Sequence, residues 1–209
     1  MQQDLFAIPT HSFETLPMED AFIRYWPSFI DSAQALRLYQ KLRDSLSWQQ
    51  DFIRMYGKQV KIPRLQSWYG DEDAHYRYSG LSMQPQPWTG ELRDLRLQVE
   101  QACDAQFNSV LANWYRDGQD SMGWHADDEA ELGKHPLIAS VTLGQTRDFD
   151  FRHKQSGKKV RIPLLSGSLL VMGGCTQEFW QHGISKGAGA LDGRINLTFR
   201  KIYSQDTTL

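Results

Sequence analysis

The second half of the chain reads as a series of short β-strands separated by turns that contain glycine. The segments that favour strands are residues 107–115, 138–143, 148–153, 159–164, 168–172 and 194–202. Many short strands after a helical start are typical of an antiparallel double sheet. The sequence therefore predicts an α+β fold built around a double-stranded β-helix, or jelly roll, and such a sandwich can hold a metal between its two sheets.

The first half predicts N-terminal helices and a hairpin beside this core. One helix is expected to begin at residues 31–32 and a second after Thr89, because apolar residues recur on one face of each segment. Both helices are expected to pack on a sheet. We therefore expect an N-terminal extension (1–30), a region of helices and a hairpin (31–106) and a jelly-roll core (107–209), the last two forming one continuous domain.

The composition limits where such a chain works and what it contacts. Its net charge is −2, so contact with a polyanion would depend on local basic patches. Cys103 and Cys175 are the only cysteines, which fits a reducing compartment better than a disulfide framework. No run of about 18 apolar residues indicates a membrane span. We expect an intracellular monomer, cytoplasmic in a bacterium and nuclear in a eukaryote.

A metal site is indicated by the segment around residue 125. His125 and Asp127 lie two residues apart, so on an extended segment their side chains point to the same face. His182 is the best candidate for a third ligand. Two histidines and one carboxylate on one face of a metal leave other positions open, which suits non-haem Fe(II). The pair His125 and Asp127 alone also fits a hydrogen-bonded pair in a loop.

The last predicted strand has one apolar face and one polar face. Ile195, Leu197 and Phe199 are expected in the core. The opposite face carries Arg194, Asn196, Thr198 and Arg200, and an earlier strand carries Asn113 and Tyr115 on one of its faces. Because guanidinium groups match carboxylates, these residues could hold a small dicarboxylate beside the metal. A half-buried strand that faces water shows the same alternation.

The spacing of the two arginines limits how they act together. Arg194 and Arg200 are about 20 Å apart along an extended strand, which exceeds the length of a small dicarboxylic acid. Either their side chains lean toward each other, or one of them acts without touching the ligand.

Residues 51–64 predict a basic hairpin with Tyr56-Gly57-Lys58 at its tip. Its basic residues, together with aromatic residues further along the chain, suit phosphate contact and base stacking. An ordinary cationic hairpin with core aromatics fits equally well. A second basic run, residues 147–161, is expected either to contact phosphate or to be a solvated loop. The histidines outside the metal site are expected on the surface, namely His11, His75, His135 and His153.

Taken together, these segments resemble the AlkB family of iron- and 2-oxoglutarate-dependent dioxygenases over roughly residues 45–203. The resemblance is closest to the branch that repairs alkylated bases in double-stranded DNA. The segments that carry it are Asn113-Trp-Tyr115, His125-x-Asp127-Asp-Glu, Ile138-Ala-Ser-Val, Asp148-Phe-Asp-Phe-Arg-His-Lys, Gly167-Ser-Leu-Leu, His182 and Arg194-x-Asn-Leu-Thr-Phe-Arg-Lys. Each fragment is common, but the ordered set is specific to the family.

The resemblance implies a reaction and a set of ligands. It implies Fe(II) bound by His125, Asp127 and His182, and O2 as the oxidant. It implies 2-oxoglutarate bound by Asn113, Tyr115, Arg194, Asn196, Thr198 and Arg200. It also implies oxidative demethylation of bases of the 1-methyladenine and 3-methylcytosine type in duplex or single-stranded DNA, with release of formaldehyde and succinate.

The resemblance further implies that the damaged base is flipped out of the DNA, and that the hairpin tip fills the space it leaves. The residues expected to contact the substrate are Tyr56, Gly57, Lys58, Arg64, Gln66, Tyr76, Tyr78, Asp128 and Glu129. Asp128 is expected to bind Arg200, Arg64 or the target base. Two alternatives stay open. One is the same chemistry on RNA or another substrate, and the other is a non-catalytic nucleic-acid-binding module.

Overall fold

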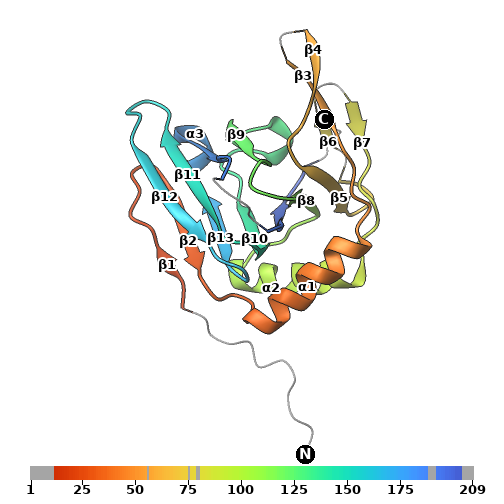
Figure 1. The fold of residues 1–209 in the computed structure, drawn as a ribbon. Coiled ribbons are helices and arrows are strands. Elements are labelled where there is room, and N and C mark those ends of the chain that lie inside the picture. Colours follow the sequence, from red (N-terminus) through yellow and green to blue (C-terminus); the bar gives the residue numbers. More distant parts are fainter. Residues whose placement is uncertain (1–11, 56, 75, 79–80, 188–191, 204–209) are drawn as a thin grey trace, which may run out of the picture.

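The computed structural model describes residues 12–55, 57–74, 76–78, 81–187 and 192–203 (Figure 1). Its elements, in chain order, are β1 (Glu14–Thr15), β2 (Phe22–Trp26), α1 (Ser32–Ser45), β3 (Phe52–Met55), β4 (Lys58–Lys61), β5 (Leu65–Gly70), β6 (Tyr76–Tyr78), β7 (Leu81–Met83), α2 (Gly90–Cys103), β8 (Ser109–Tyr115), β9 (Met122–His125), the 3-10 turn η1 (Ala130–Leu132), β10 (Ile138–Gly144), β11 (Arg147–His153), β12 (Lys159–Leu164), β13 (Leu169–Gly173), α3 (Thr176–Phe179), β14 (Trp180–Ile184) and β15 (Arg194–Arg200).

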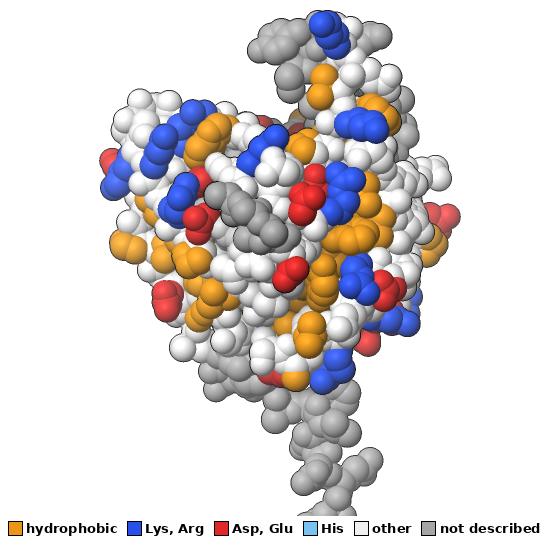
Figure 2. Space-filling view, viewed as in Figure 1, with side chains coloured by type: hydrophobic (Ala, Val, Ile, Leu, Met, Phe, Trp, Pro, Cys, Tyr) orange, Lys and Arg blue, Asp and Glu red, His pale blue; other side chains and the backbone are white. Residues whose placement is uncertain are grey.

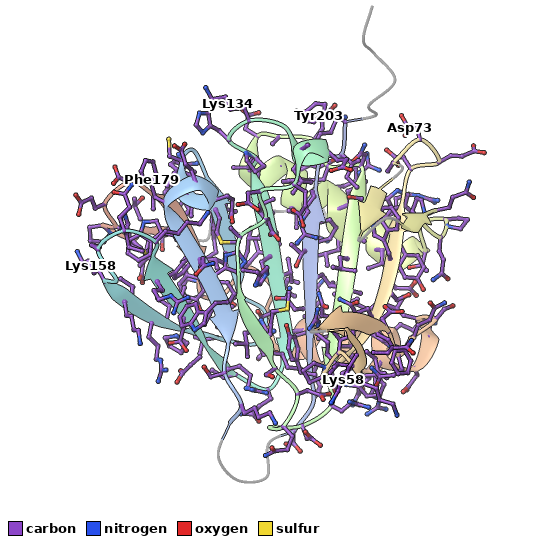
Figure 3. The ribbon with its side chains drawn as sticks, turned by 90° about the horizontal axis from the view of Figure 1, so that it is seen from above. Lys58, Asp73, Lys134, Lys158, Phe179 and Tyr203 are labelled. Carbon is purple, nitrogen blue, oxygen red and sulfur yellow. The ribbon has the colours of Figure 1, made fainter. Side chains whose placement is uncertain are left out.

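Two antiparallel sheets form the core. The larger has the strand order β1-β2-β13-β10-β15-β8-β5, and the smaller has the order β12-β11-β14-β9. Seen from above, they form two layers with side chains between them (Figure 3). The predicted α+β fold with a jelly-roll core is therefore confirmed.

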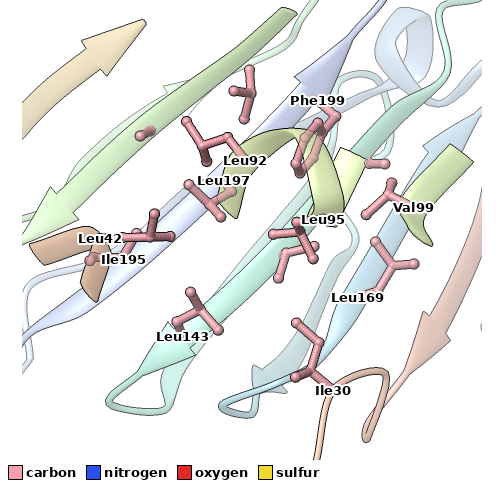
Figure 4. Close-up of a cluster of buried hydrophobic side chains, with 14 of the residues drawn as sticks. Ile30, Leu42, Leu92, Leu95, Val99, Leu143, Leu169, Ile195, Leu197 and Phe199 are labelled. Carbon is pink, nitrogen blue, oxygen red and sulfur yellow. The ribbon is translucent and has the colours of Figure 1, made fainter. Parts of the chain in front are cut away.

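Apolar and polar residues alternate along β15, so one face of the strand packs against the helices and the other faces the second sheet. Its apolar residues pack with α1 and α2 on the outer face of the large sheet, where Leu42, Leu92 and Leu95 meet Leu197 and Phe199 (Figure 4). The polar residues of β15 face the second sheet instead. Because successive strand side chains point to opposite faces, each polar side chain is directed into the space between the sheets.

Both helices begin where the sequence predicted. The Asp31 side chain accepts a hydrogen bond from the backbone N of Gln34 at 2.9 Å, and the Thr89 side chain accepts one from that of Leu92 at 3.3 Å. Each contact satisfies a backbone donor that the first turn of a helix leaves open. Within the described residues, no helix is long and apolar enough to cross a lipid bilayer.

The N-terminal segment differs from the prediction of a separate extension. Residues 22–26 form β2, which pairs with β13 along its whole length and so belongs to the large sheet (Figure 1). Ile23 is fully buried and Trp26 is 5% exposed. The expected boundary at residue 30 is therefore wrong for residues 14–30, because these residues bury apolar side chains against a strand far along the chain.

The predicted basic hairpin is present as β3 and β4, which stand away from the two sheets (Figure 1). Gly57 lies in the turn with φ of +77°, a conformation that favours glycine. Tyr56 lies outside the described residues.

If residues 22–26 belong to the folded core, removing a buried side chain there is expected to cost stability. Ile23→Ala should lower the free energy of unfolding by about 2–5 kcal/mol, since it leaves a cavity between the sheets. Leu36→Ala in α1, where the side chain is 55% exposed, should change it by less than about 0.5 kcal/mol. Denaturant titration of both variants measures the difference, and equal effects would contradict this assignment.

Candidate functional site

Three potential metal ligands converge between the sheets. His125 ends β9, Asp127 follows two residues later, and His182 lies on the paired strand β14, directly opposite His125. The ligand atoms of the three side chains all lie within 4.8 Å of one another. All three residues are predicted ligands, but neither β9 nor β14 is among the strands predicted from the sequence.

The rings of the two histidines are oriented for metal binding. His125 Nδ1 lies 2.9 Å from the carbonyl oxygen of Gly123, so a neutral ring that donates this hydrogen bond keeps its Nε2 lone pair free. His125 Nε2 is 4.0 Å from Asp127 Oδ1. The His125 and His182 ring centroids are 4.3 Å apart. One oxygen and two nitrogen donors on one side of a small space fit Fe(II) with open coordination positions.

Electrostatics keep these side chains in the forms that bind a cation. Burial raises the pKa of Asp127, but Arg200, His182 and His125 together outweigh it and hold the pKa at about 2. Arg200 Nη2 donates to Asp127 Oδ1 at 2.8 Å. Burial, reinforced by His125, lowers the pKa of His182 to about 3. At neutral pH the site therefore offers an ionised carboxylate and a neutral His182.

The backbone of Asp127 is held by a residue that the sequence analysis did not identify. The backbone N of Asp127 donates to Gln177 Oε1 at 2.9 Å. Gln177 lies in α3 and is 2% exposed. Nothing in its local sequence marks it, because its role depends on a contact across 50 residues.

Arg194 supplies a buried positive charge at the first residue of β15. It is fully buried, and its Nη2 donates to Thr142 Oγ1 and to Asn196 Oδ1, both at 2.9 Å. Its Nε and Nη1 make no hydrogen bond to the described residues, and its Cζ lies 5.3 Å from the centre of the Tyr115 ring. Burial lowers its pKa to about 10, so it remains charged at neutral pH. A buried cation with donors unused is matched by an anion such as a carboxylate.

A small cavity of about 40 Å³ brings the other predicted cosubstrate residues together. Its lining includes Asn113, Tyr115, Asn196, Thr198 and Arg200, as well as the three potential metal ligands. Asn196 Nδ2 donates to Thr198 Oγ1 at 2.7 Å, and Arg194 lies behind this lining through its bond to Asn196.

The two arginines do not meet over one group. Arg194 bonds Thr142 and Asn196, whereas Arg200 bonds the potential metal ligand Asp127. The two arginines, which are too far apart along the strand to bind one small dicarboxylate together, therefore contact different groups.

A larger cavity of about 340 Å³ is lined by two of the three potential metal ligands, His125 and Asp127. Its walls come from the base of the hairpin, from β5 and from the segment 125–129. It shares His125, Asp127 and Arg200 with the small cavity. Glu129 also lines it, and the Oε2 atom of Glu129 is buried and makes no hydrogen bond to the described residues. This volume falls in the range of about 300–1,000 Å³ that holds small organic ligands.

The residues predicted to contact a substrate divide into three groups. Glu129, Gln66 and Arg64 line the larger cavity. Gly57 and Lys58 lie exposed on the hairpin. Tyr56 lies outside the described residues, and Tyr76 and Tyr78 are described only as the backbone of β6.

Two further predictions change in part. Of the three alternatives for Asp128, the structure shows neither the contact with Arg200 nor the one with Arg64, since its exposed carboxylate faces Lys154 Nζ at 3.4 Å, and contact with a target base stays a prediction. His135 is exposed as predicted, but His153 is only 5% exposed. The Nδ1 atom of His153 accepts hydrogen bonds from the backbone N atoms of Gln155 and Ser156, and its ring packs against Trp180. His11 and His75 lie outside the described residues.

Residues 22–200 match the model of a family described as the 2OG-Fe(II) oxygenase superfamily. Among curated proteins, the chain is 39% identical over 188 residues to human alpha-ketoglutarate-dependent dioxygenase alkB homolog 3, a match that covers 85% of this chain and 65% of that protein. It is 44% identical over 158 residues to human DNA oxidative demethylase ALKBH2, covering 72% of this chain and 60% of that protein. The chain therefore spans less than two thirds of the length of these two relatives.

A solved structure shows the same fold. It is described as the structure of OsALKBH1, with a TM-score of 0.65 at 18% identity, covering 91% of this chain and all of that one. At this identity the likeness supports the fold alone.

Removing any of the three potential metal ligands is expected to abolish metal binding at this site. His125→Ala, Asp127→Ala and His182→Ala should each weaken Fe(II) binding by more than the roughly 10- to 100-fold that loss of an outer partner of a ligand costs. Calorimetric titration with Fe(II) under anaerobic conditions measures this. Asp128→Asn is the matched control, since its carboxylate points to Lys154, and it should keep the metal affinity of the unmodified protein. Unchanged affinity in any of the three ligand variants would contradict the assignment.

Replacing Arg194 is expected to weaken dicarboxylate binding without weakening the fold. Arg194→Met should reduce 2-oxoglutarate affinity by about 10- to 150-fold, because a charge-assisted contact contributes about 1.5–3 kcal/mol. It should not lower the melting temperature, because the guanidinium is only partly hydrogen-bonded in the free protein. Unchanged affinity, or a large loss of stability, would contradict this role.

Arg147 offers the matched control for the Arg194 variant. It is also buried, but it donates to the backbone carbonyls of Asp117, Asp120 and Ser185 at 2.7–3.1 Å. Arg147→Met leaves these acceptors unpaired and should therefore lower the free energy of unfolding by about 1–3 kcal/mol.

Proposed function

Because the chain belongs to the AlkB family within the 2OG-Fe(II) oxygenase superfamily, we propose that it oxidatively removes alkyl groups from damaged bases in DNA. The carrying observation is that His125 and Asp127 line two cavities, and that His182 lines the smaller of them. The small cavity is lined by the polar face of β15, and the large one has room for a base. Cosubstrate and substrate can thus approach one metal through different cavities.

Each residue of the site would bind the metal, the cosubstrate or another side chain. His125, Asp127 and His182 would hold Fe(II), and Arg194 would bind the distal carboxylate of 2-oxoglutarate in the space between the sheets. Asn113, Tyr115, Asn196 and Thr198 would supply neutral hydrogen bonds, and Arg200 would fix the Asp127 carboxylate. When bound, Fe(II) and 2-oxoglutarate supply the oxidising power for hydroxylation of the alkyl carbon by O2. A methyl group hydroxylated on a ring nitrogen then leaves as formaldehyde.

The large cavity favours a base that carries a positive charge. Methylation at N1 of adenine or N3 of cytosine leaves the ring cationic near neutral pH. Glu129 lines this cavity, and its buried Oε2 makes no hydrogen bond to the described residues. It can accept a hydrogen bond from the exocyclic amine of such a base while its charge offsets that of the ring. This arrangement supports 1-methyladenine and 3-methylcytosine as the substrate type.

Contact with nucleic acid would rest on local basic surfaces, because the net charge of the chain is −2. Lys and Arg side chains gather on the projecting hairpin and over β11 and β12 (Figure 2). Lys58 on the hairpin and Lys158 after β11 lie well apart from each other on the molecule (Figure 3). Two such surfaces can hold phosphates on either side of an extruded nucleotide.

A turnover assay tests the proposed function. The protein is incubated with Fe(II), 2-oxoglutarate and O2 and with matched single-stranded and duplex DNA that carries 1-methyladenine or 3-methylcytosine. Formaldehyde and succinate should appear in equal amounts and depend on the methylated base. DNA binding without either product would contradict the proposal and favour a non-catalytic binding module, whereas turnover of methylated RNA alone would favour the alternative substrate.

The hairpin is expected to matter for duplex DNA more than for single strands. A base can reach the metal only after extrusion, which costs a few kcal/mol in a duplex. Tyr56 is the aromatic residue at the predicted tip, and a side chain that fills the vacated space offsets part of that cost. Tyr56→Ala should lower turnover of methylated duplex by about tenfold or more, consistent with about 1–3 kcal/mol for one aromatic–base stack. Single-strand turnover should change little.

Gln59→Ala, at an exposed position of the same hairpin, is the control and should leave both rates unchanged. Equal losses on both substrates in a stably folded Tyr56→Ala protein would show that Tyr56 does not act as a wedge.

A further inference from the structure

Arg64 joins the base of the hairpin to the interior of the site. It lies between β4 and β5 and is 5% exposed, unlike Lys58 and Lys61 on the hairpin. Its Nε donates to Asn113 Oδ1 at 2.8 Å, and its Nη1 reaches the carbonyl oxygen of Ser121 at 3.5 Å. Arg64 makes no ion pair with any described carboxylate. Its charge is thus directed inward, to a residue that lines the small cavity.

The contact with Arg64 decides which way the Asn113 amide faces. A guanidinium group only donates hydrogen bonds, so the Asn113 atom that faces Arg64 must be the carbonyl oxygen. The Gln66 side-chain amide also lies 2.9 Å from this oxygen. The Nδ2 of Asn113 is then left to donate elsewhere. Asn113 lines the small cavity beside Tyr115 and Asn196, where a carboxylate or keto oxygen would accept that hydrogen bond.

The segment around Arg64 is also fixed to the strand that carries His125. The backbone N of Ser121 donates to the carbonyl oxygen of Pro63 at 2.9 Å, and β9 begins at the next residue, Met122. Arg64 therefore sits where the hairpin, β9 and Asn113 on β8 meet. A residue that bound DNA phosphate would need an exposed charge, and Arg64 lacks one.

We propose that Arg64 is a positioning residue for 2-oxoglutarate: it holds the Asn113 amide so that Nδ2 donates to the cosubstrate. The predicted contact of Arg64 with the substrate is the competing role, since Arg64 also lines the larger cavity. The inference rests on the proposed function in taking 2-oxoglutarate as the ligand of the small cavity. It adds that the base of the DNA-recognition hairpin takes part in cosubstrate binding.

A double-mutant cycle tests this role through binding alone. The dissociation constant of 2-oxoglutarate is measured with Mn(II) in place of Fe(II), for the unmodified protein, Arg64→Met, Asn113→Ala and the double variant. Arg64→Met should weaken binding by about 5- to 20-fold. In the Asn113→Ala background the same change should add less than about twofold, because the amide it positions is gone. Affinity for methylated duplex DNA should stay within about twofold.

Two further variants sharpen the result. Lys58→Ala, on the exposed hairpin, should show the opposite pattern, with weaker DNA binding and unchanged 2-oxoglutarate binding. Arg64→Lys keeps the charge but lacks the planar Nε donor, so it should also weaken 2-oxoglutarate binding. This variant replaces Arg64→Met in the test if Arg64→Met does not fold stably.

The outcomes separate the possible failures. Loss of DNA affinity with unchanged 2-oxoglutarate binding in Arg64→Met would overturn the inference and restore the DNA contact. Additive effects of the two substitutions would show that Arg64 acts on the fold and not through Asn113. If the coupling appears but methylated DNA is not turned over, the positioning role stands and the proposed substrate fails.

Discussion

The ion pair between Arg200 and Asp127 ties the candidate metal site to the fold. Arg200 lies on the large sheet, whereas Asp127 follows a strand of the small sheet, so the pair exists only when the sandwich is closed. Burial raises the pKa of Asp127, and Arg200 is the strongest of the groups that lower it to about 2 and so keep the carboxylate ionised. Gln177 fixes the backbone of the same residue from α3. The donor set is thus a product of the packing of the two sheets.

Arg194 and Arg147 show how one residue type serves opposite purposes in this interior. Arg147 is buried with acceptors for its donors and joins three loop carbonyls. Arg194 is buried with two nitrogens that make no hydrogen bond to the described residues. Such an unsatisfied cation lowers stability unless an anion binds beside it. A stable fold alone does not require it, and this is the physical reason to connect Arg194 with a ligand.

Burial also decides what the basic residues near the hairpin do. Lys58 and Arg64 are six residues apart and appear equivalent as charges in the sequence. In the structure, Lys58 faces solvent, whereas Arg64 turns inward to Asn113 across 49 residues of sequence. The first suits phosphate contact and the second suits the orientation of a neutral amide. The hairpin thus carries an exposed charge at Lys58, and a buried charge lies at its base at Arg64.

The sequence by itself determined the two helices, the hairpin and six strands, because caps and alternation depend on residues only two to four positions apart. The polar face of β15 and the pair His125 and Asp127 followed from the same local patterns, whereas His182 was a candidate that the family resemblance supported. The strands β2, β9 and β14 depend on the tertiary structure, because their short segments lack a strong pattern. They become strands by pairing, β2 with β13, β14 with β11 and β9 with β14. The tertiary structure also decided the partners of Arg64, Asp128 and Arg200, because side-chain contacts depend on distance in space, which spacing along the chain does not encode.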